Sequence, residues 1–198
     1  MSPKPSMQVQ VDGRKYIFPD DTKSKKLDES TTYDLLRGEG FPCVDIATIR
    51  SDALYLIEVK DYDHPSTKEP MEDGLVKAIT QKVYGSLSVL ALLNFGDDSN
   101  VSQAYVNEMD FAKSALSCRD LIVVADIFTS ACSRLNNPNR RRSQKIMPTG
   151  INIHQKLHAK FKKLGIRVQV HRNGQQAKGG IQPFWYSSRD SETRNLHS

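Results

Sequence analysis

The segment Glu58-Val59-Lys60 contains the residues of this chain that are best suited to chemistry. It closes an apolar run, residues 54–57, that has the composition of a buried strand. Thirteen residues before Glu58, Asp45 lies in a second strand-like run, residues 44–49. The dipeptide Ser51-Asp52 between the two runs suits a tight turn, so the sequence predicts an antiparallel hairpin.

The register of this hairpin decides whether the two acids meet. With Ser51-Asp52 as the turn, Asp45 faces Glu58 directly. Directly opposed side chains have Cβ atoms about 4.5–5.5 Å apart, and like charges placed in this way are destabilising. Strand alternation puts Glu58 and Lys60 together on the face that should pack the core. A hard divalent cation between the carboxylates would remove the repulsion, and this is the chemistry of metal-assisted phosphodiester cleavage.

Other interpretations of the same residues remain open. A three-residue turn would shift the register by one and make Asp45 a diagonal neighbour of Glu58, still within reach of one metal ion. The triplet acid-x-Lys is not specific by itself, because Asp21-Thr22-Lys23 also fits it within a polar segment. An ordinary amphipathic hairpin, with Glu58 and Lys60 as surface charges, is the alternative.

Asp45 on one strand, followed by Glu58-x-Lys60 on the next, resembles the PD-(D/E)XK nuclease superfamily, which includes many restriction enzymes. The resemblance covers about residues 28–93 in detail, and it departs from the pattern in that no proline directly precedes Asp45. It implies that Asp45, Glu58 and the carbonyl of Val59 hold Mg²⁺, for which Mn²⁺ can substitute. It also implies that Lys60 orients or activates the attacking water.

A helix predicted over about residues 72–93 follows this strand, with Lys77, Gln81 and Tyr84 in one polar stripe. In exonuclease-like members of the superfamily, a Gln and a Tyr on this helix approach the site. The resemblance therefore implies that Gln81 orients water or phosphate and that Lys77 and Tyr84 contact nucleic acid. A solvated helix face is the alternative. A short helix is also predicted over about residues 30–37. An acid at this helix, Glu29 or Asp34, could add a metal ligand, or serve as a surface charge or cap.

A loop over residues 136–145 is rich in amides and positive charge. Its four cations are candidates for binding phosphates, although basic loops are also frequent on ordinary soluble surfaces. They are Arg140, Arg141, Arg142 and Lys145.

A different motif places His154 and His158 four residues apart on a predicted helix, like a zinc protease. That pattern requires a glutamate after the first histidine, and here the residue is Gln155.

The order of elements predicts an α/β fold. We expect a mixed central sheet of about five or more strands, with the antiparallel catalytic hairpin extended by parallel strands and helices on both faces, as in restriction endonucleases. We expect one nuclease domain over residues 1–178, with a hairpin at 8–18, a catalytic core at 28–93 and completing α/β elements at 99–171. Residues 179–198 are predicted to be a polar C-terminal tail, within which Phe184-Trp185-Tyr186 could pack against the domain.

Composition agrees with a globular protein of 198 residues, with 38% hydrophobic and 26% charged residues and a net charge of +5. Without an apolar run near 18 residues or a signal-peptide core, we expect neither membrane insertion nor secretion. The odd number of cysteines, Cys43, Cys118 and Cys132, favours reduced thiols and a cytoplasmic location.

These observations predict a Mg²⁺-dependent nuclease, expected to act on DNA as an endonuclease in restriction, phage defence or repair. RNA is a possible substrate for the same site. A chain of this size could work as a homodimer or as the cutting subunit of a larger complex. The alternative from a different class is a non-catalytic nucleic-acid-binding or assembly subunit that keeps the nuclease fold.

Overall fold

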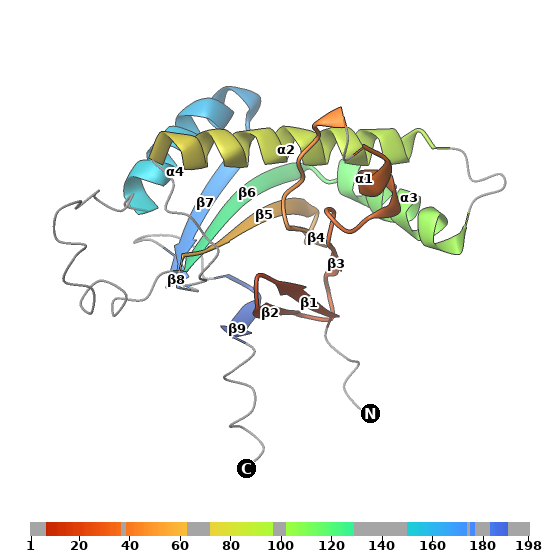
Figure 1. Ribbon diagram of the computed structural model, residues 1–198, viewed down its shortest axis with the longest axis horizontal. Helices are drawn as coiled ribbons and strands as arrows, with labels where there is room; N and C mark the ends of the chain where they lie inside the picture. The colour runs from red at the N-terminus through yellow and green to blue at the C-terminus, as the bar shows by residue number, and fades with distance from the viewer. Residues whose placement is uncertain are drawn as a thin grey trace, which may run out of the picture.

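The computed structural model describes residues 7–36, 39–62, 72–96, 102–128, 150–173, 175–176 and 183–189. Within these ranges the protein is a mixed α/β fold with two sheets and four α-helices (Figure 1). In chain order the elements are β1 (Met7–Val11), β2 (Arg14–Phe18), β3 (Lys23–Lys25), α1 (Thr31–Leu36), β4 (Ile46–Arg50), β5 (Ala53–Asp61), α2 (Glu72–Asn94), α3 (Gln103–Leu116), β6 (Asp120–Phe128), α4 (Gly150–Phe161), the 3₁₀ turn η4 (Lys162–Leu164), β7 (Arg167–Arg172), β8 (Gln175–Gln176) and β9 (Tyr186–Arg189).

The larger sheet has six strands in the order β3-β4-β5-β6-β7-β8. The strand β6 is parallel to both β5 and β7, and the other neighbours are antiparallel, so the predicted mixed sheet is confirmed. The predicted two-residue turn is also confirmed, because Arg50 pairs with Ala53. Ser51 and Asp52 have φ values of 48° and 61°, the left-handed conformation that the tightest hairpin turns require.

In the part of the chain that the structure describes, α2, α3 and α4 cover one face of the six-stranded sheet. Buried residues of α2, α3 and α4 form one continuous core with Leu54, Leu56 and the strand residues on that side. The expectation of helices on both faces was wrong, because the other face is covered by a second sheet of order β1-β2-β9 (Figure 1). That sheet can replace a helical layer because its strands alternate, with one face buried through Val9, Val11, Tyr16 and Phe18.

The C-terminal region adds the third strand of the small sheet. Residues 179–198 were expected to be a polar tail, but Tyr186–Arg189 forms β9 and pairs antiparallel with β2. Just before it, Trp185 is 6% exposed and its ring centroid lies 6.1 Å from that of Phe18. A short polar strand is stabilised here by a partner from the opposite end of the chain, which local composition does not reveal.

The predicted helix over residues 72–93 agrees with α2 to within a few residues, whereas β3 is a strand in a polar segment where the sequence predicts none. The predicted N-terminal hairpin is β1-β2, with Asp12-Gly13 as its turn. The helix α3 begins at Gln103 with Ser102 as its N-cap, since the Ser102 hydroxyl accepts a hydrogen bond from the Tyr105 N–H.

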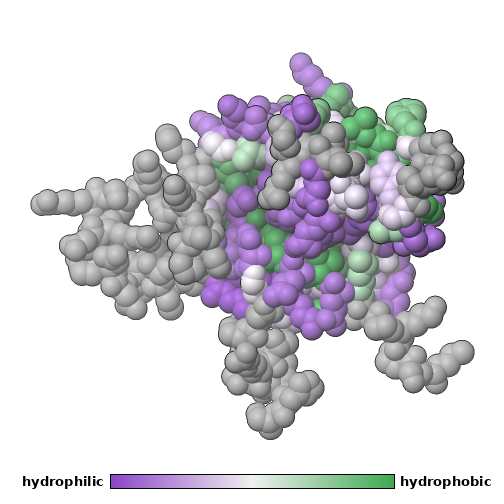
Figure 2. Space-filling view, turned by 45° about the vertical axis from the view of Figure 1, so that its right-hand side comes forward, coloured by the Kyte–Doolittle hydropathy of each residue, from purple (hydrophilic) through white to green (hydrophobic). Residues whose placement is uncertain are grey.

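The outer surface of the helical layer carries hydrophobic side chains, and Figure 2 shows that hydrophobic residues gather in the upper part of that view. On α2 and just beyond it, Tyr84, Leu92 and Phe95 are exposed. None of the helices in the described ranges has the length and apolarity to cross a membrane. Cys43 is a buried free thiol, Cys118 is a partly buried one, and Cys132 lies outside those ranges.

Candidate functional site

The two acids singled out from the sequence lie side by side at the end of the β4-β5 hairpin. The ladder runs from Arg50 and Ala53 to Ile46 and Ile57, so the next pair brings Asp45 opposite Glu58. Both face the helical layer, and they are 8% and 1% exposed. The predicted juxtaposition of two buried carboxylates is therefore present.

Asp45 is held in one orientation by the backbone of β5. Its Oδ2 accepts a hydrogen bond of 2.7 Å from the Val59 N–H, which leaves Oδ1 to face the helix. The N–H and C=O of one strand residue point to the same neighbouring strand. The Val59 carbonyl therefore points to the same side as Asp45, at the place where the β4 ladder has already ended.

A lysine that the sequence analysis did not select, Lys82 on α2, bridges the two acids. Its Nζ lies 3.2 Å from Asp45 Oδ1 and 2.9 Å from Glu58 Oε1. A signal for it existed in the sequence. Lys82 falls at helical spacing between the buried residues Ile79 and Val89, so a charged residue interrupts the stripe that faces the sheet.

Lys60 completes the group, with its Nζ 2.5 Å from Glu58 Oε1. Glu58 Oε1 is thus within ion-pair distance of two ammonium groups, although neither contact has the geometry of a hydrogen bond. Its other oxygen, Oε2, is buried and has no hydrogen-bond partner in the part of the chain that the structure describes. The two carboxylates are balanced by two ammonium groups whose side chains are about one-quarter exposed. We call these four residues the helical-face cluster.

Burial controls the electrostatics of this cluster. Burial, together with the neighbouring Asp45 carboxylate, raises the pKa of Glu58 to about 7. Burial alone would lower the pKa of Lys82, but Glu58 and Asp45 outweigh it, so that pKa rises and the ammonium form is favoured. A third acid, Asp28, is raised in pKa mainly by burial and also by Asp45, and its Oδ1 has no partner among the described residues.

Close packing of α2 against the segment before β4 fixes the positions of Asp45 and Lys82. A Cβ added at Gly85 would lie 2.0 Å from the Pro42 carbonyl oxygen, so only glycine permits this approach. The next residue, Ser86, accepts a 2.9 Å hydrogen bond from the Val44 N–H through its hydroxyl, which donates to the carbonyl of Lys82 one turn earlier. The site is therefore built between a helix and a hairpin that follow each other in sequence.

The other predicted site residues on α2 are placed differently. Lys77 and Gln81 are exposed, and neither belongs to the bridge that Lys82 makes. Tyr84 is 46% exposed and its ring meets Phe161 edge-on, with centroids 6.1 Å apart. The predicted basic-loop residues lie outside the described residues; they are Arg140, Arg141, Arg142 and Lys145.

The acids considered as additional ligands do not join the cluster. Glu29 is paired with Lys26 at 2.5 Å and its side chain is 65% exposed, while Asp34 is exposed. The N-cap of α1 is Ser30, whose hydroxyl accepts a hydrogen bond from the Tyr33 N–H. Both acids therefore occupy surface positions.

The paired histidines on α4 have an ordinary structural environment. The rings of His154 and His158 stack with centroids 5.9 Å apart, and His154 Nε2 lies 3.2 Å from the Val168 carbonyl oxygen. Across the described ranges, the structure contains no group of three or more His, Cys, Asp and Glu side chains that could hold a metal ion.

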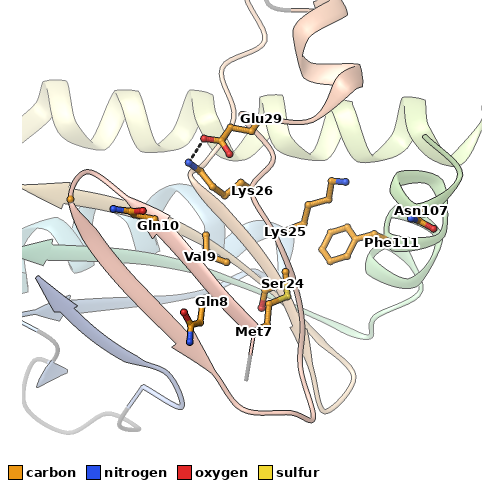
Figure 3. Close-up of a pocket in the computed structure, with 11 residues that line it drawn as sticks. Met7, Gln8, Val9, Gln10, Ser24, Lys25, Lys26, Glu29, Asn107 and Phe111 are labelled. Atoms are coloured by element: carbon orange, nitrogen blue, oxygen red, sulfur yellow. Dashed lines mark hydrogen bonds and ion pairs between the residues drawn. The ribbon is translucent and has the colours of Figure 1, made fainter. Parts of the chain in front are cut away.

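A groove of about 850 Å³ lies beside β3, between the β1-β2 hairpin and α3 (Figure 3). Its lining includes Lys25, Lys26 and Gln10, with Phe111 on the side of α3. Figure 3 shows Lys26 and Glu29 paired at its upper end. The lining contains no member of the helical-face cluster, so this groove and the buried acids are separate features.

Comparisons with protein-family models, curated proteins and solved structures give no match to this chain. The assignment of a metal site therefore depends on the chemistry of its oxygen donors. Two carboxylates and one carbonyl are the hard oxygen ligands that Mg²⁺ prefers, and such ions commonly keep several waters when few protein ligands are present. The unpartnered Glu58 Oε2 gives a buried oxygen still free to bind, so the residues present fit a magnesium site.

Proposed function

We propose that the chain is a metal-dependent nuclease that hydrolyses phosphodiester bonds, with DNA as the expected substrate. The observation that carries the proposal is the convergence of Asp45 and Glu58 on one cation, with a buried oxygen of Glu58 left over. Two opposed acids beneath a helix are costly to bury for structural reasons alone. Their arrangement also supports the resemblance to the restriction endonuclease-like fold, which remains part of this proposal.

In this proposal Asp45, Glu58 and the Val59 carbonyl hold Mg²⁺, which when bound stabilises charge on the scissile phosphate and lowers the pKa of a coordinated water. The Val59 N–H fixes the Asp45 carboxylate, so that Oδ1 faces the site. Lys60 is one-quarter exposed at the end of β5, where its ammonium can orient the attacking water. Gln81 on the exposed side of α2 would contact water or phosphate only once substrate covers the helix.

The partners that we propose follow from the same chemistry. The substrate would lie over Lys77 and Tyr84 and against the basic loop, with RNA as a second possible polymer. Restriction, phage defence and repair in the cytoplasm are the corresponding roles. A homodimer, or the cutting subunit of a larger complex, would allow both strands of a duplex to be cut.

One observation favours a second candidate, a non-catalytic binding or assembly subunit. The two acids are already neutralised by Lys60 and Lys82, so the cluster has no net charge without a metal ion. A structural ion-pair network of this kind would need no cofactor. The two candidates differ in metal binding, which only the nuclease requires.

The test is cleavage of plasmid, linear duplex and single-stranded DNA and of RNA with Mg²⁺ or Mn²⁺. Wild type is compared with Glu58→Ala and Lys60→Ala, and with Asp73→Ala as a control for an exposed acid. Metal-dependent cutting that is lost in the first two variants and kept in the control supports the nuclease. No cutting of any substrate by wild type, together with no Mn²⁺ binding, would favour the assembly subunit.

A further inference from the structure

We propose that Lys82 is a resident counter-ion that competes with a divalent cation for Asp45 and Glu58. The inference rests on the proposed function, since it concerns the same two carboxylates. The Lys82 ammonium lies 3.2 Å from Asp45 Oδ1 and 2.9 Å from Glu58 Oε1. A single positive charge thus occupies the point on which the two acids converge.

An ammonium group and a magnesium ion cannot share that point. Mg²⁺ binds oxygen at about 2.0–2.1 Å in a near-octahedral shell, whereas an ammonium hydrogen-bonds the same oxygens at about 2.7–2.9 Å. Asp45 Oδ2 already accepts the Val59 N–H, so a metal ion held by both acids would bind Asp45 Oδ1 and the unpartnered Glu58 Oε2. Its binding therefore requires that the Lys82 ammonium leaves Asp45 Oδ1. The Lys82 side chain is 24% exposed on a flexible four-carbon stem, so its ammonium can move towards solvent while its helix stays in place.

The two lysines of the cluster do not have the same role. Lys60 contacts Glu58, whereas Lys82 contacts both acids and is the cation recorded on Asp45 Oδ1. Lys82 also lies on the sheet-facing stripe of α2, where Ser86 ties its backbone to the segment before β4. Lys82 is thus a positioning residue that keeps the opposed acids together without metal and that metal binding displaces.

The test measures Mn²⁺ affinity of the full chain by electron paramagnetic resonance of the free ion. Wild type is compared with Lys82→Met, which keeps the length of the side chain, and with Lys77→Met, which removes an exposed charge from the same helix. We expect Lys82→Met to bind Mn²⁺ at least about tenfold more tightly than wild type, because the competing charge is gone. We expect Lys77→Met to change the affinity by less than about twofold, because solvent and salt screen an exposed charge.

A second measurement needs no variant. Reductive methylation of wild type, followed by mass spectrometry, compares the modification rates of Lys82 and Lys77 with and without saturating Mn²⁺. If metal displaces the ammonium of Lys82, its rate rises relative to that of Lys77. Equal Mn²⁺ affinities in the two methionine variants, with no rise in the modification of Lys82, would overturn the proposal.

The outcomes separate this inference from the proposed function. Metal-dependent cleavage by wild type, with unchanged affinity in Lys82→Met, overturns the role of Lys82 and leaves the nuclease intact. No Mn²⁺ binding by wild type or by Lys82→Met overturns both. If Lys82→Met binds Mn²⁺ more tightly than wild type but neither wild type nor the variant cleaves any substrate, the role of Lys82 is supported and the nuclease is contradicted.

Discussion

Strand β5 has a buried acid on each of its faces, and the two acids are paired with different kinds of cation. On the helical face, Glu58 is held by the ammonium groups of Lys60 and Lys82. On the small-sheet face, Asp61 accepts a 2.8 Å hydrogen bond from Arg14 Nε on β2 and a 3.2 Å bond from Arg189 Nη2 on β9. We call Arg14, Asp61 and Arg189 the small-sheet cluster.

The kind of cation separates the two clusters. The Arg14 guanidinium lies 3.4 Å from the centre of the Phe128 ring and donates in a fixed plane, so it is stacked as well as paired. This cluster joins three strands of two sheets. Lysine ammonium groups are compact point charges on flexible stems, and both in the helical-face cluster are partly exposed. We infer that the arginine pairs of the small-sheet cluster stabilise the fold. The lysines of the helical-face cluster can instead be displaced from their acids by another cation.

A further buried acid on the small-sheet side, Asp126, is held by a neutral hydrogen-bond partner. The Tyr16 hydroxyl donates a 3.0 Å hydrogen bond to Asp126 Oδ2, and His171 stands next to Asp126 on the neighbouring strand. Burial raises the pKa of Asp126 to about 6 and lowers that of His171 to about 4. Both His171 ring nitrogens lack hydrogen-bond partners within the described residues.

The largest expected effect tests the helical face. Glu58→Gln keeps the shape of the side chain but removes the charge that would hold the metal. We expect cleavage to fall at least about a thousandfold, equivalent to about 4 kcal/mol in the barrier. The free energy of unfolding should change by less than about 1 kcal/mol, because the Lys60 and Lys82 side chains are one-quarter exposed and their ammonium groups can turn to solvent once the charge is lost. Single-turnover cleavage and urea unfolding measure the two quantities, and a severe loss of stability would contradict the comparison.

The reciprocal change tests the small-sheet face. Asp61→Asn leaves Arg14, which is 8% exposed, without a counter-charge, so we expect a loss of about 4 kcal/mol in the free energy of unfolding. Cleavage per folded molecule should stay near that of wild type. Asp73→Asn is the matched control, because Asp73 is exposed and paired with Lys156 on the surface, so its replacement should leave the free energy of unfolding near that of wild type. If Asp61→Asn and Asp73→Asn were equally stable, the small-sheet cluster would not stabilise the fold, and the distinction between the clusters would be lost.

The buried histidine predicts how stability depends on pH. The pKa of His171 is about 4 in the folded state and about 6.5 when unfolded, so between these values the unfolded chain binds the extra proton. Its contribution to stability is therefore present above pH 6.5 and lost as pH falls towards 4, by about 3 kcal/mol in all. The difference in unfolding free energy between wild type and His171→Phe should follow this curve.

The neighbouring acid supplies a control of opposite sign. Because the folded pKa of Asp126 is raised to about 6, its contribution is present at low pH and is lost as pH rises towards 6. Comparing wild type with Asp126→Asn, which can still accept the Tyr16 hydrogen bond, should reveal this reversed slope. Matching slopes in the two variants would contradict the assigned shifts.

The next effect concerns the packing that positions the helical-face cluster. Gly85→Ala forces α2 away from Pro42, and we expect a loss of about 2 kcal/mol in stability together with weaker cleavage. Gly74→Ala is the control on the same helix, because nothing lies within 4 Å of an added Cβ there. It should be neutral or stabilise by up to about 1 kcal/mol. Thermal unfolding and cleavage assays of both variants check the contrast.

The smallest effect concerns Gln81, which we propose contacts water or phosphate only in the substrate complex. Gln81 is exposed, so Gln81→Ala should lower cleavage by less than about tenfold, less than about 1.4 kcal/mol, and leave the unfolding free energy within about 0.5 kcal/mol of wild type. A loss comparable to that of Glu58→Gln would show that Gln81 reaches the reacting atoms in the complex.

The sequence by itself determined the elements that local patterns encode. Apolar strand-like runs indicated β4 and β5, and Ser51-Asp52 as a two-residue turn predicted the register that the structure has, because such a turn leaves only one pairing. Asp45 and Glu58 could therefore be placed opposite each other before any coordinates. Helical spacing likewise defined α2 and its buried face.

Only the tertiary structure decided what surrounds those acids. Lys82 reaches them because α2 packs closely on the segment before β4, and helical spacing indicates a face but not its contacts. The pairing of β9 with β2, and with it the tie of Arg189 to Asp61, joins opposite ends of the chain. Sequence patterns encode periodicity within an element, whereas such contacts depend on how separate elements share one core.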